Sequence, residues 1–400
     1  MSAAGTTNRS DQPTDTMDKR LQRDVQAWDD IHEHRTGTPG DATTAEWLAR
    51  EAHAAGAQTE LDWFAFQRRV PGECSVSAGG RRVEGLPMFD GGFTSPQSEP
   101  EGHRGPLQAL DAVSGIGLVE FGPGPWHRGT QVLERARLAN ALQAIVAVAA
   151  DEQIAPGLAV LNAEHYQKPF GPVVLQVGTG ARNWLLDLKA KRTPVTVIAE
   201  APLEHTRAAN VMVRIPGSDE SLAPLVVMTP RSGWFTCTSE RGGGIAIWLE
   251  CIRYFGVNPP ERTVLFTANT GHELGHIGLE HYLQRHHDLI AGAHAWLHLG
   301  ANFAASAGAI RFQASPAFLA DGVAELATHG INDPTTTPPH ERPLGEARDI
   351  FDGGGRYVSL LGSNRMFHHP DDRWPDAVDM DKLSRLAKAM LAIAAHLAHA

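Results

Sequence analysis

The stretch ERTVLFTANTGHELGHIGLEHY, residues 261–282, decides the fold and carries the strongest functional signal of the chain. Its first part, Thr263 to Ala268, is β-branched and apolar, which predicts a buried strand. Three ionisable side chains, His272, Glu273 and His276, follow within five positions, and glycines stand at 275 and 278, where a helix would begin. We therefore predict a strand-to-helix junction that places His272 and Glu273 at the carboxyl end of a strand. In an open α/β sheet, that edge binds ligands.

The letters HELGH at 272–276 also match the pattern HExxH. In that pattern, two histidines one helical turn apart bind zinc and the glutamate acts as a base. This alternative makes His272 and His276 the ligands, and it requires a helix that already runs at His272. The two glycines favour the junction instead, with His276 on the first helical turn.

The surrounding sequence alternates between strand-like and helical stretches. Helical spacing is expected at 18–31 and 43–55, with Thr43 or Thr44 as the cap of the second helix. Further along, strands are expected at 210–215, 225–229, 263–268, 293–299 and 357–361, and helices at 244–254, 277–285, 316–328 and 381–397. Such alternation predicts an α/β layer structure with a mostly parallel central sheet.

Between the helix expected at 43–55 and the strand expected at 210–215, the sequence consists of short β-like pieces separated by glycine and proline. Strands are expected at 81–86, 117–121, 144–148 and 173–177, and a helix at 135–144. We interpret residues 76–205 as a smaller mixed domain inserted into a larger one built from 18–75 and 206–400. Residues 1–17 are expected to form a disordered tail.

Composition restricts the class of protein. The chain has 400 residues and a formal charge of -11, and no block of lysine or arginine interrupts it, so a nucleic-acid partner is not expected. No apolar run approaches the length of a membrane span, and the polar start lacks the apolar core of a secretory signal. We expect a cytoplasmic protein without a membrane partner, whose three cysteines are packed thiols, and which could form a homo-oligomer.

The loops that follow the predicted strands should meet at one edge of the sheet. They are 229–232, 270–273, 298–302, 345–348 and 367–372. Carboxylates and imidazoles occur in four of these five loops, although the loops come from remote parts of the chain. Such convergence predicts a functional site there.

Four motifs give the chain a resemblance to the co-catalytic zinc aminopeptidases, metallopeptidase family twenty-eight. They are HRTGTPGD at 34–41, NVMVRIPGS at 210–218, GHELGHIGLEHYL at 271–283 and FHHPDD at 367–372. The resemblance spans nearly the whole chain. It implies a three-layer α/β sandwich, and it identifies the inserted unit as similar to the protease-associated domain that many members carry.

In that family, five side chains hold two zinc ions. The resemblance places His272 at the position of the catalytic base, and it keeps Glu273 and His368 as metal ligands. The other three ligand positions are changed and fall on Pro230, Ser239 and His298. The first of them belongs to a His-x-Asp motif in the family, and the aspartate of that motif falls on Ser232. Because two dications held close together need a bridging anion and several carboxylates, two metal ions are not expected here.

A single divalent ion, most simply zinc, remains compatible with the residues present. Its expected ligands are Glu273, His368 and His298, and the groups expected to take part in catalysis are His272, Glu240 and Glu346. Arg231, Ser232 and Arg348 are expected to bind the substrate, a small molecule or short peptide.

The predicted activity is therefore metal-dependent hydrolysis of an amide, peptide or related C–N bond. Two alternatives stay open. One is a non-catalytic binding protein on the same scaffold. The other is a cyclase or lyase-like enzyme that uses one zinc ion, as the glutaminyl cyclases of the same family do.

Overall fold

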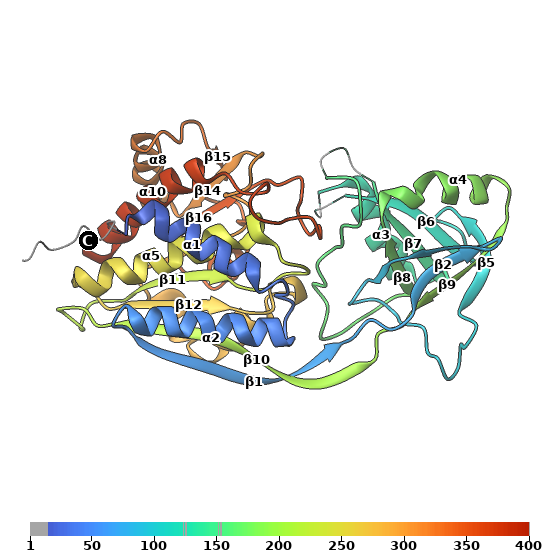
Figure 1. Ribbon diagram of the computed structural model, residues 1–400, viewed down its shortest axis with the longest axis horizontal. Helices are drawn as coiled ribbons and strands as arrows, with labels where there is room; N and C mark the ends of the chain where they lie inside the picture. The colour runs from blue at the N-terminus through green and yellow to red at the C-terminus, as the bar shows by residue number, and fades with distance from the viewer. Residues whose placement is uncertain (1–14, 123, 125, 151, 153, 400) are drawn as a thin grey trace, which may run out of the picture.

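The computed structural model describes residues 15–122, 124, 126–150, 152 and 154–399, and these residues form two eight-stranded sheets (Figure 1). Most of the tail expected at 1–17 lies outside the described residues, and Met17 already belongs to the first helix. No helix in the described ranges has both the length and the apolarity that a membrane crossing requires.

The first sheet has a parallel centre, and the strand on each side of this centre runs antiparallel to it. Its strands, in spatial order, are β1 Gln58–Arg69, β10 Leu203–Ile215, β12 Val264–Asn269, β11 Leu225–Pro230, β13 Ala295–Leu299, β16 Tyr357–Gly362, β14 Ile310–Ala314 and β15 Thr335–Thr336. The four central strands β12, β11, β13 and β16 are parallel to one another. Their carboxyl ends therefore meet at one edge, as the sequence predicts.

Helices cover both faces of this sheet. One face carries α1 Met17–Asp30, α2 Pro39–Ala54, α5 Gly243–Val257, α8 Pro316–Thr328 and α10 Met380–His399, and the other carries α6 Ile277–Arg285, α7 Asp288–Gly292 and α9 Ala347–Asp352. Alternation along β11 explains why both faces are apolar: Leu225 and Val227 pack on the first face, and Val226 and Met228 on the second. The predicted three-layer sandwich is confirmed.

The second sheet is mixed and comes from strands between Cys74 and Ala199. In spatial order they are β3 Arg81–Glu84, β2 Cys74–Ala78, β9 Pro194–Ala199, β5 His103–Gln108, β6 Ile116–Phe121, β7 Ala144–Ala149, β8 Val173–Val177 and β4 Leu86–Pro87. Helices α3 Arg128–Ala139 and α4 Arg182–Ala190 pack on opposite faces of it. Figure 1 shows that β1 and β10 form the ribbon between the two sheets.

One irregular segment of the second unit lies against the first. This segment, residues 155–166, is called the strap below. Val160, Ala163 and Tyr166 of the strap join an apolar cluster with Trp234 and Leu274 of the larger sheet unit. Ring contacts extend the same cluster, because Phe89 stacks on Trp234 with centroids 4.8 Å apart. The apolar contact fixes the strap next to the loops that follow β11 and β12.

Several local expectations need correction. The second helix begins at Pro39, and its cap is Thr38, whose hydroxyl accepts from the Asp41 backbone N–H, so Thr43 and Thr44 are not caps. Helix α3 begins at Arg128, seven residues before the expected start. Strand β1 was not expected, because its mixed charged and aromatic sequence, QTELDWFAFQRR, lies on an edge ribbon rather than in the core.

Candidate functional site

The loops at the carboxyl ends of the central strands bring most of the predicted site residues to one edge. Arg231 and Ser232 follow β11, His272 and Glu273 follow β12, and His298 lies within β13. Glu346 precedes α9, and His368 follows β16. The predicted convergence of remote loops is therefore present, but the side chains separate into four groups with different partners.

The junction after β12 is built on three residues in the left-handed region. Gly271 has φ +80°, Gly275 has φ +79° and His276 has φ 64°. Residues His272–Leu274 form one 3-10 turn, and α6 begins only at Ile277. No continuous helix therefore runs from His272 to His276, so the HExxH geometry is not formed. The left-handed turns nevertheless stack the two imidazole rings, with centroids 5.1 Å apart and an interplanar angle of 25°.

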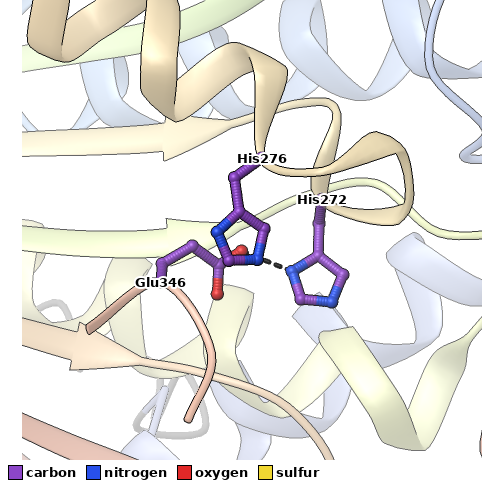
Figure 2. Close-up of side chains that lie close together, drawn as sticks. All are labelled: His272, His276 and Glu346. Atoms are coloured by element: carbon purple, nitrogen blue, oxygen red, sulfur yellow. Dashed lines mark hydrogen bonds and ion pairs between the residues drawn. The ribbon is translucent and has the colours of Figure 1, made fainter. Parts of the chain in front are cut away.

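The first group consists of His272, His276 and Glu346, which point toward one another (Figure 2). Within the described part of the chain, these three residues form the cluster of potential metal ligands: one ligand atom from each lies within 4.8 Å of the others. His272 Nδ1 donates to Glu346 Oε1 at 2.5 Å. His276 Nδ1 donates to Asp349 Oδ2 at 2.7 Å, which leaves Nε2 of that ring with a free lone pair when the ring is neutral.

His298 holds Glu346 in place through a hydrogen bond to its second carboxylate oxygen. The amide oxygen of Gln313 accepts from the Leu344 backbone N–H, so its amide nitrogen is the atom that donates to Ser359 Oγ. Ser359 can then donate its proton to His298 Nδ1, 2.9 Å away. In the neutral ring, His298 Nε2 consequently carries a hydrogen and donates it to Glu346 Oε2 at 3.0 Å. Both nitrogens of His298 are used, so the structure gives it a positioning role rather than an open ligand position.

Electrostatics keep the first group in a form that can bind a cation. Burial lowers the pKa of His272 to about 4, and the Arg241 charge acts in the same direction, so the ring is neutral at pH 7. Burial disfavours the Glu346 carboxylate, but His272 and His276 outweigh it and hold the pKa of Glu346 well below its usual range. The neutral His272 ring therefore lies beside an ionised Glu346 carboxylate.

The second group surrounds Glu273. Glu273 Oε1 accepts from the backbone N–H and the hydroxyl of Thr36, at 2.8 and 2.7 Å. Its Oε2 accepts from Ser232 Oγ at 2.6 Å. Ser232 Oγ also accepts from the His272 backbone N–H, at 3.1 Å. Glu273 and Ser232 thus fasten the β12 junction to the loop that begins at His34, and Glu273 is not part of the cluster of potential metal ligands.

The third group contains the two arginines expected to bind substrate. Arg231 is fully buried and donates to Asp41 Oδ1 at 2.7 Å and to the Ala209 carbonyl, so its charge is balanced inside the protein. Arg348 makes an ion pair with Glu164 of the strap at 2.6 Å. The structure places Arg348 at the margin of the site and Arg231 beneath it.

The fourth group consists of Glu240, Arg241 and His368. Glu240 Oε1 lies 2.7 Å from Arg241 Nη2 and 3.7 Å from His368 Nε2. His368 Nδ1 donates to the Val160 carbonyl at 2.8 Å. Glu273, His298 and His368, the three ligands expected from the sequence, therefore lie in three different groups.

The strap covers this edge of the sheet. Besides the Val160 contact, the Ala163 N–H donates to the Glu273 carbonyl at 2.8 Å, and Trp234 Nε1 donates to Asn162 Oδ1 at 3.1 Å. His272, His276 and Glu346 keep exposed fractions of 7%, 4% and 3%. All three side chains are therefore buried beside the strap.

Sequence reasoning did not single out Asp349, Arg241, Ser359 or Glu164. A signal for Asp349 existed, because Glu346 and Asp349 are three residues apart at the start of a helix and so share a face. Arg241 directly follows Glu240 in the sequence. Glu164 could not be found in this way, because only the folding of the second unit brings the strap to the site.

Comparison with solved structures identifies the fold class: the chain has the fold of the zinc aminopeptidases. A zinc aminopeptidase from Bacillus subtilis matches with a TM-score of 0.74 and 15% identity over 94% of each chain. The peptidase M28 precursor from Shewanella amazonensis SB2B matches with a TM-score of 0.69 and 14% identity, over 96% of this chain and 97% of that one.

A third match is the aminopeptidase from Aneurinibacillus sp. strain AM-1, with a TM-score of 0.67 and 16% identity over 96% of this chain and 93% of that one. A scan of family models and a search of curated proteins find no match to the chain. The fold expected from the sequence resemblance is confirmed. At these identities the likeness concerns the fold, and function has to be argued from the site.

Proposed function

We propose that the protein is a metal-dependent hydrolase of an amide, peptide or related C–N bond, acting on a small molecule or short peptide with one divalent ion, most simply zinc. The observation that carries the proposal is the convergence of His272, His276 and Glu346 within 4.8 Å. Two imidazoles and one carboxylate are a donor set of catalytic zinc sites in hydrolases. The zinc aminopeptidase and the M28 peptidase that share the fold support the same class of reaction.

The surroundings of the three residues fit a metal ion. Asp349 holds His276 through Nδ1, and His298 holds Glu346 through Oε2, so two of the proposed ligands have the supporting hydrogen bonds typical of metal sites. The pKa of His272 is lowered to about 4, chiefly by burial, so no proton has to be displaced from a charged ring at pH 7. When bound, a zinc ion supplies a Lewis acid that polarises a carbonyl group.

The residues around the cluster would prepare the substrate. Closing the strap over His272, His276 and Glu346 excludes water from the reacting bond, which strengthens every polar interaction there. Arg348, which pairs with Glu164 at the margin, is available to a substrate carboxylate once that pair opens.

Metal analysis tests the proposal. Purified protein expressed with zinc in the medium should contain about one equivalent, and His276→Gln combined with Glu346→Gln should contain none. His329→Gln, a substitution on the α8 surface, should keep the metal and serves as the control. Hydrolysis of a panel of dipeptides, N-acyl amino acids and amino-acid amides should then be lost on chelation. Wild-type protein that takes up no divalent ion would sink the proposal.

One observation favours a second candidate, a non-catalytic binding protein. In the loop after β11, the charge of Arg231 is neutralised by Asp41. In the loop after β12, where a metal ligand is expected, both oxygens of Glu273 accept hydrogen bonds from Thr36 and Ser232. The charged groups of Arg231 and Glu273 therefore have protein partners and need no metal ion. A folded protein with neither bound metal nor hydrolytic activity on the same panel supports this candidate.

A further inference from the structure

Four buried polar atoms next to the proposed metal site make no hydrogen bond, although two of them, Glu240 Oε1 and Arg241 Nη2, form an ion pair at 2.7 Å. They are Glu240 Oε1, Arg241 Nη1, Arg241 Nη2 and His368 Nε2, and each has practically no exposed surface. Their residues are 0–2% exposed. Arg241 is held in place through Nε, which donates to the Ser232 carbonyl at 2.9 Å, so its two terminal nitrogens cannot turn away to other acceptors. Buried polar groups are nearly always satisfied, so such a cluster indicates an occupant.

The hydrogen on His368 can be assigned from its partner. The Val160 carbonyl oxygen can only accept, so His368 Nδ1 carries the hydrogen of their 2.8 Å bond. In the neutral ring, Nε2 is then a lone-pair acceptor. The cluster therefore consists of two acceptor atoms, His368 Nε2 and Glu240 Oε1, that lie 3.7 Å apart, and the donors of Arg241 beside them.

A single water molecule matches this set of atoms. Its oxygen can accept from Arg241, and its two hydrogens can be donated to Glu240 Oε1 and His368 Nε2. Two acceptors 3.7 Å apart can both be reached from one oxygen at hydrogen-bond distances of about 2.8 Å. Buried waters typically make two to four such bonds to groups that would otherwise be unsatisfied.

Charge argues against a cation at the same place. Glu240 Oε1 is already paired with the Arg241 guanidinium at 2.7 Å, so a metal ion or an ammonium group would be a second positive charge beside Arg241. A neutral occupant preserves the balance. The cluster also adjoins the proposed metal site, because Ser232 contacts both: its carbonyl accepts from Arg241 Nε at 2.9 Å, and its hydroxyl accepts from the His272 backbone N–H at 3.1 Å.

We infer that Glu240, Arg241 and His368 hold one water molecule, and that this water is the nucleophile of the hydrolysis, with His368 Nε2 as the atom that accepts its proton. The inference rests on the proposed function for its second part. The water oxygen forms a bond to the carbonyl carbon while one of its protons moves to Nε2. The C–N bond then breaks, and the same proton passes to the leaving nitrogen, so that an acid and an amine are produced and the imidazole is restored.

Other groups at this edge are less suited to accept that proton. His272 Nδ1 is engaged with Glu346, and both nitrogens of His298 have partners. Both oxygens of Glu273 are held by Thr36 and Ser232. His272 and His276 are proposed metal ligands, whereas His368 lies outside that set, and its Nδ1 bond to Val160 orients the ring and leaves Nε2 unpartnered. The carbonyl belongs to the strap, so its closure completes the orientation of the base.

A zinc-loaded crystal structure with anomalous data is the first test. The expected result is one anomalous peak at His272, His276 and Glu346, and a water peak within hydrogen-bond distance of Glu240, Arg241 and His368. An anomalous peak between Glu240 and His368 would overturn the inference, because it would make His368 a metal ligand. Absence of any density among the four atoms would overturn it as well.

The second test is His368→Asn in the zinc-loaded enzyme. The asparagine amide can replace the N–H that donates to Val160 but offers no basic ring nitrogen, so kcat should fall by about 10²- to 10⁴-fold while one equivalent of zinc is retained. The matched control is His369→Asn, which removes a neighbouring contact to the strap, the bond from His369 Nε2 to the Pro156 carbonyl at 3.3 Å. This control should keep kcat near that of the wild type.

The outcomes of the two tests distinguish the role of His368 as a base from the water site and from the proposed function. If His368→Asn loses its zinc or keeps full kcat, the base role is wrong. If wild-type protein binds zinc and shows the water but cleaves no amide, the proposed function and the base role both fail, while the water site stands. Circular dichroism and thermal unfolding of both variants show whether a lost activity comes from a lost fold.

Discussion

Glu346 accepts hydrogen bonds from histidines on both of its oxygens, and the second of these bonds depends on a chain of residues deeper in the protein. Gln313 donates to Ser359, Ser359 donates to His298, and His298 donates to Glu346 Oε2. Two glycines make room for the His298 ring, since a Cβ atom at Gly300 or Gly345 would lie 2.7 or 2.9 Å from its Cε1. The position of Glu346 therefore depends on residues outside the proposed set of metal ligands.

Ser359→Ala should weaken metal binding. Without the serine hydroxyl, nothing fixes the hydrogen of His298 on Nε2, and Glu346 loses its supporting donor in part of the molecules. We expect a loss of zinc affinity of about 10- to 100-fold, measured by competition with a chelating dye. Ser306→Ala, whose hydroxyl donates to the Asp376 carbonyl in another part of the unit, is the control. Equal affinity in both variants would contradict the proposed chain.

The pH dependence of stability has a contribution from His34. This ring is fully buried, stacks on Trp28 at 3.6 Å, and burial lowers its pKa from 6.5 to about 3. Between pH 3 and 6.5 the unfolded chain therefore binds more protons at this residue than the native protein. The stability that His34 contributes is complete above pH 6.5 and is lost as the pH falls toward 3.

The difference in unfolding free energy between wild type and His34→Gln should consequently shrink as the pH falls below 6.5. The expected slope is up to about 1.4 kcal/mol per pH unit. Urea titrations between about pH 4 and 7 measure it. The comparison of the two proteins also cancels the opposite contribution of Asp372, whose pKa burial raises to about 7. Parallel curves would show that His34 is not buried in neutral form.

At the scale of the element, the β12–α6 junction determines which side chains face one another. Its two left-handed glycines let the chain turn twice within five residues, so His272 and His276 stack even though no helix joins them. Gly275 has a further function, because a Cβ atom there would lie 2.6 Å from the Glu164 carbonyl of the strap. The absence of a side chain thus allows the strap to close.

Gly275→Ala should destabilise the protein more than the same change at a left-handed glycine elsewhere. Gly56→Ala is the matched control, because Gly56 has φ +84° and a Cβ atom there would have no other atom within 4 Å. The control should cost about 1–2 kcal/mol from backbone strain alone. The cost at Gly275 should be larger, and zinc affinity should fall with it. Equal costs in urea unfolding would mean that the strap does not lie against the junction.

At the scale of the whole molecule, the strap joins the two units over the site. It is held by backbone contacts to Ala163 and Val160, by the apolar cluster around Trp234, and by the ion pair between Glu164 and Arg348. The ion pair is the most exposed of these contacts: the Glu164 and Arg348 side chains are 44% and 23% exposed. It is the contact that can open with the smallest loss of stability.

Arg348→Met should make the strap open more often without unfolding the protein. Hydrogen exchange of residues 155–166 should become faster, and zinc should be lost to a chelator more quickly, while the unfolding free energy changes by about 1 kcal/mol or less. Arg214→Met removes an exposed ion pair, with Glu220, that does not involve the strap, and should leave both rates unchanged. Identical exchange in the two variants would exclude a strap that opens at this ion pair.

How much of this could be predicted from the sequence depends on how local the signal is. Helices α6 and α8 and strand β8 have the expected limits, since their apolar periodicity is a property of a few consecutive residues. The long strand β1 was missed, because its pairing with β10 links residues that are far apart in the chain. The convergence of loops at one edge was predictable from the parallel order of the strands.

The sequence did not predict which side chains of the site contact one another. Hydrophobic periodicity and glycine placement act over short stretches of chain, so they were sufficient to predict the fold class, the position of the strand-to-helix junction, and the presence of histidines and carboxylates at one edge. Contacts between remote parts of the fold bring His276 and Glu346 to His272, bind Glu273 to Thr36 and Ser232, and place the strap against Glu273 and His368. The physical reason is that a hydrogen bond is fixed by distances of a few tenths of an ångström between atoms of remote residues, and such distances are set by the packing of whole layers.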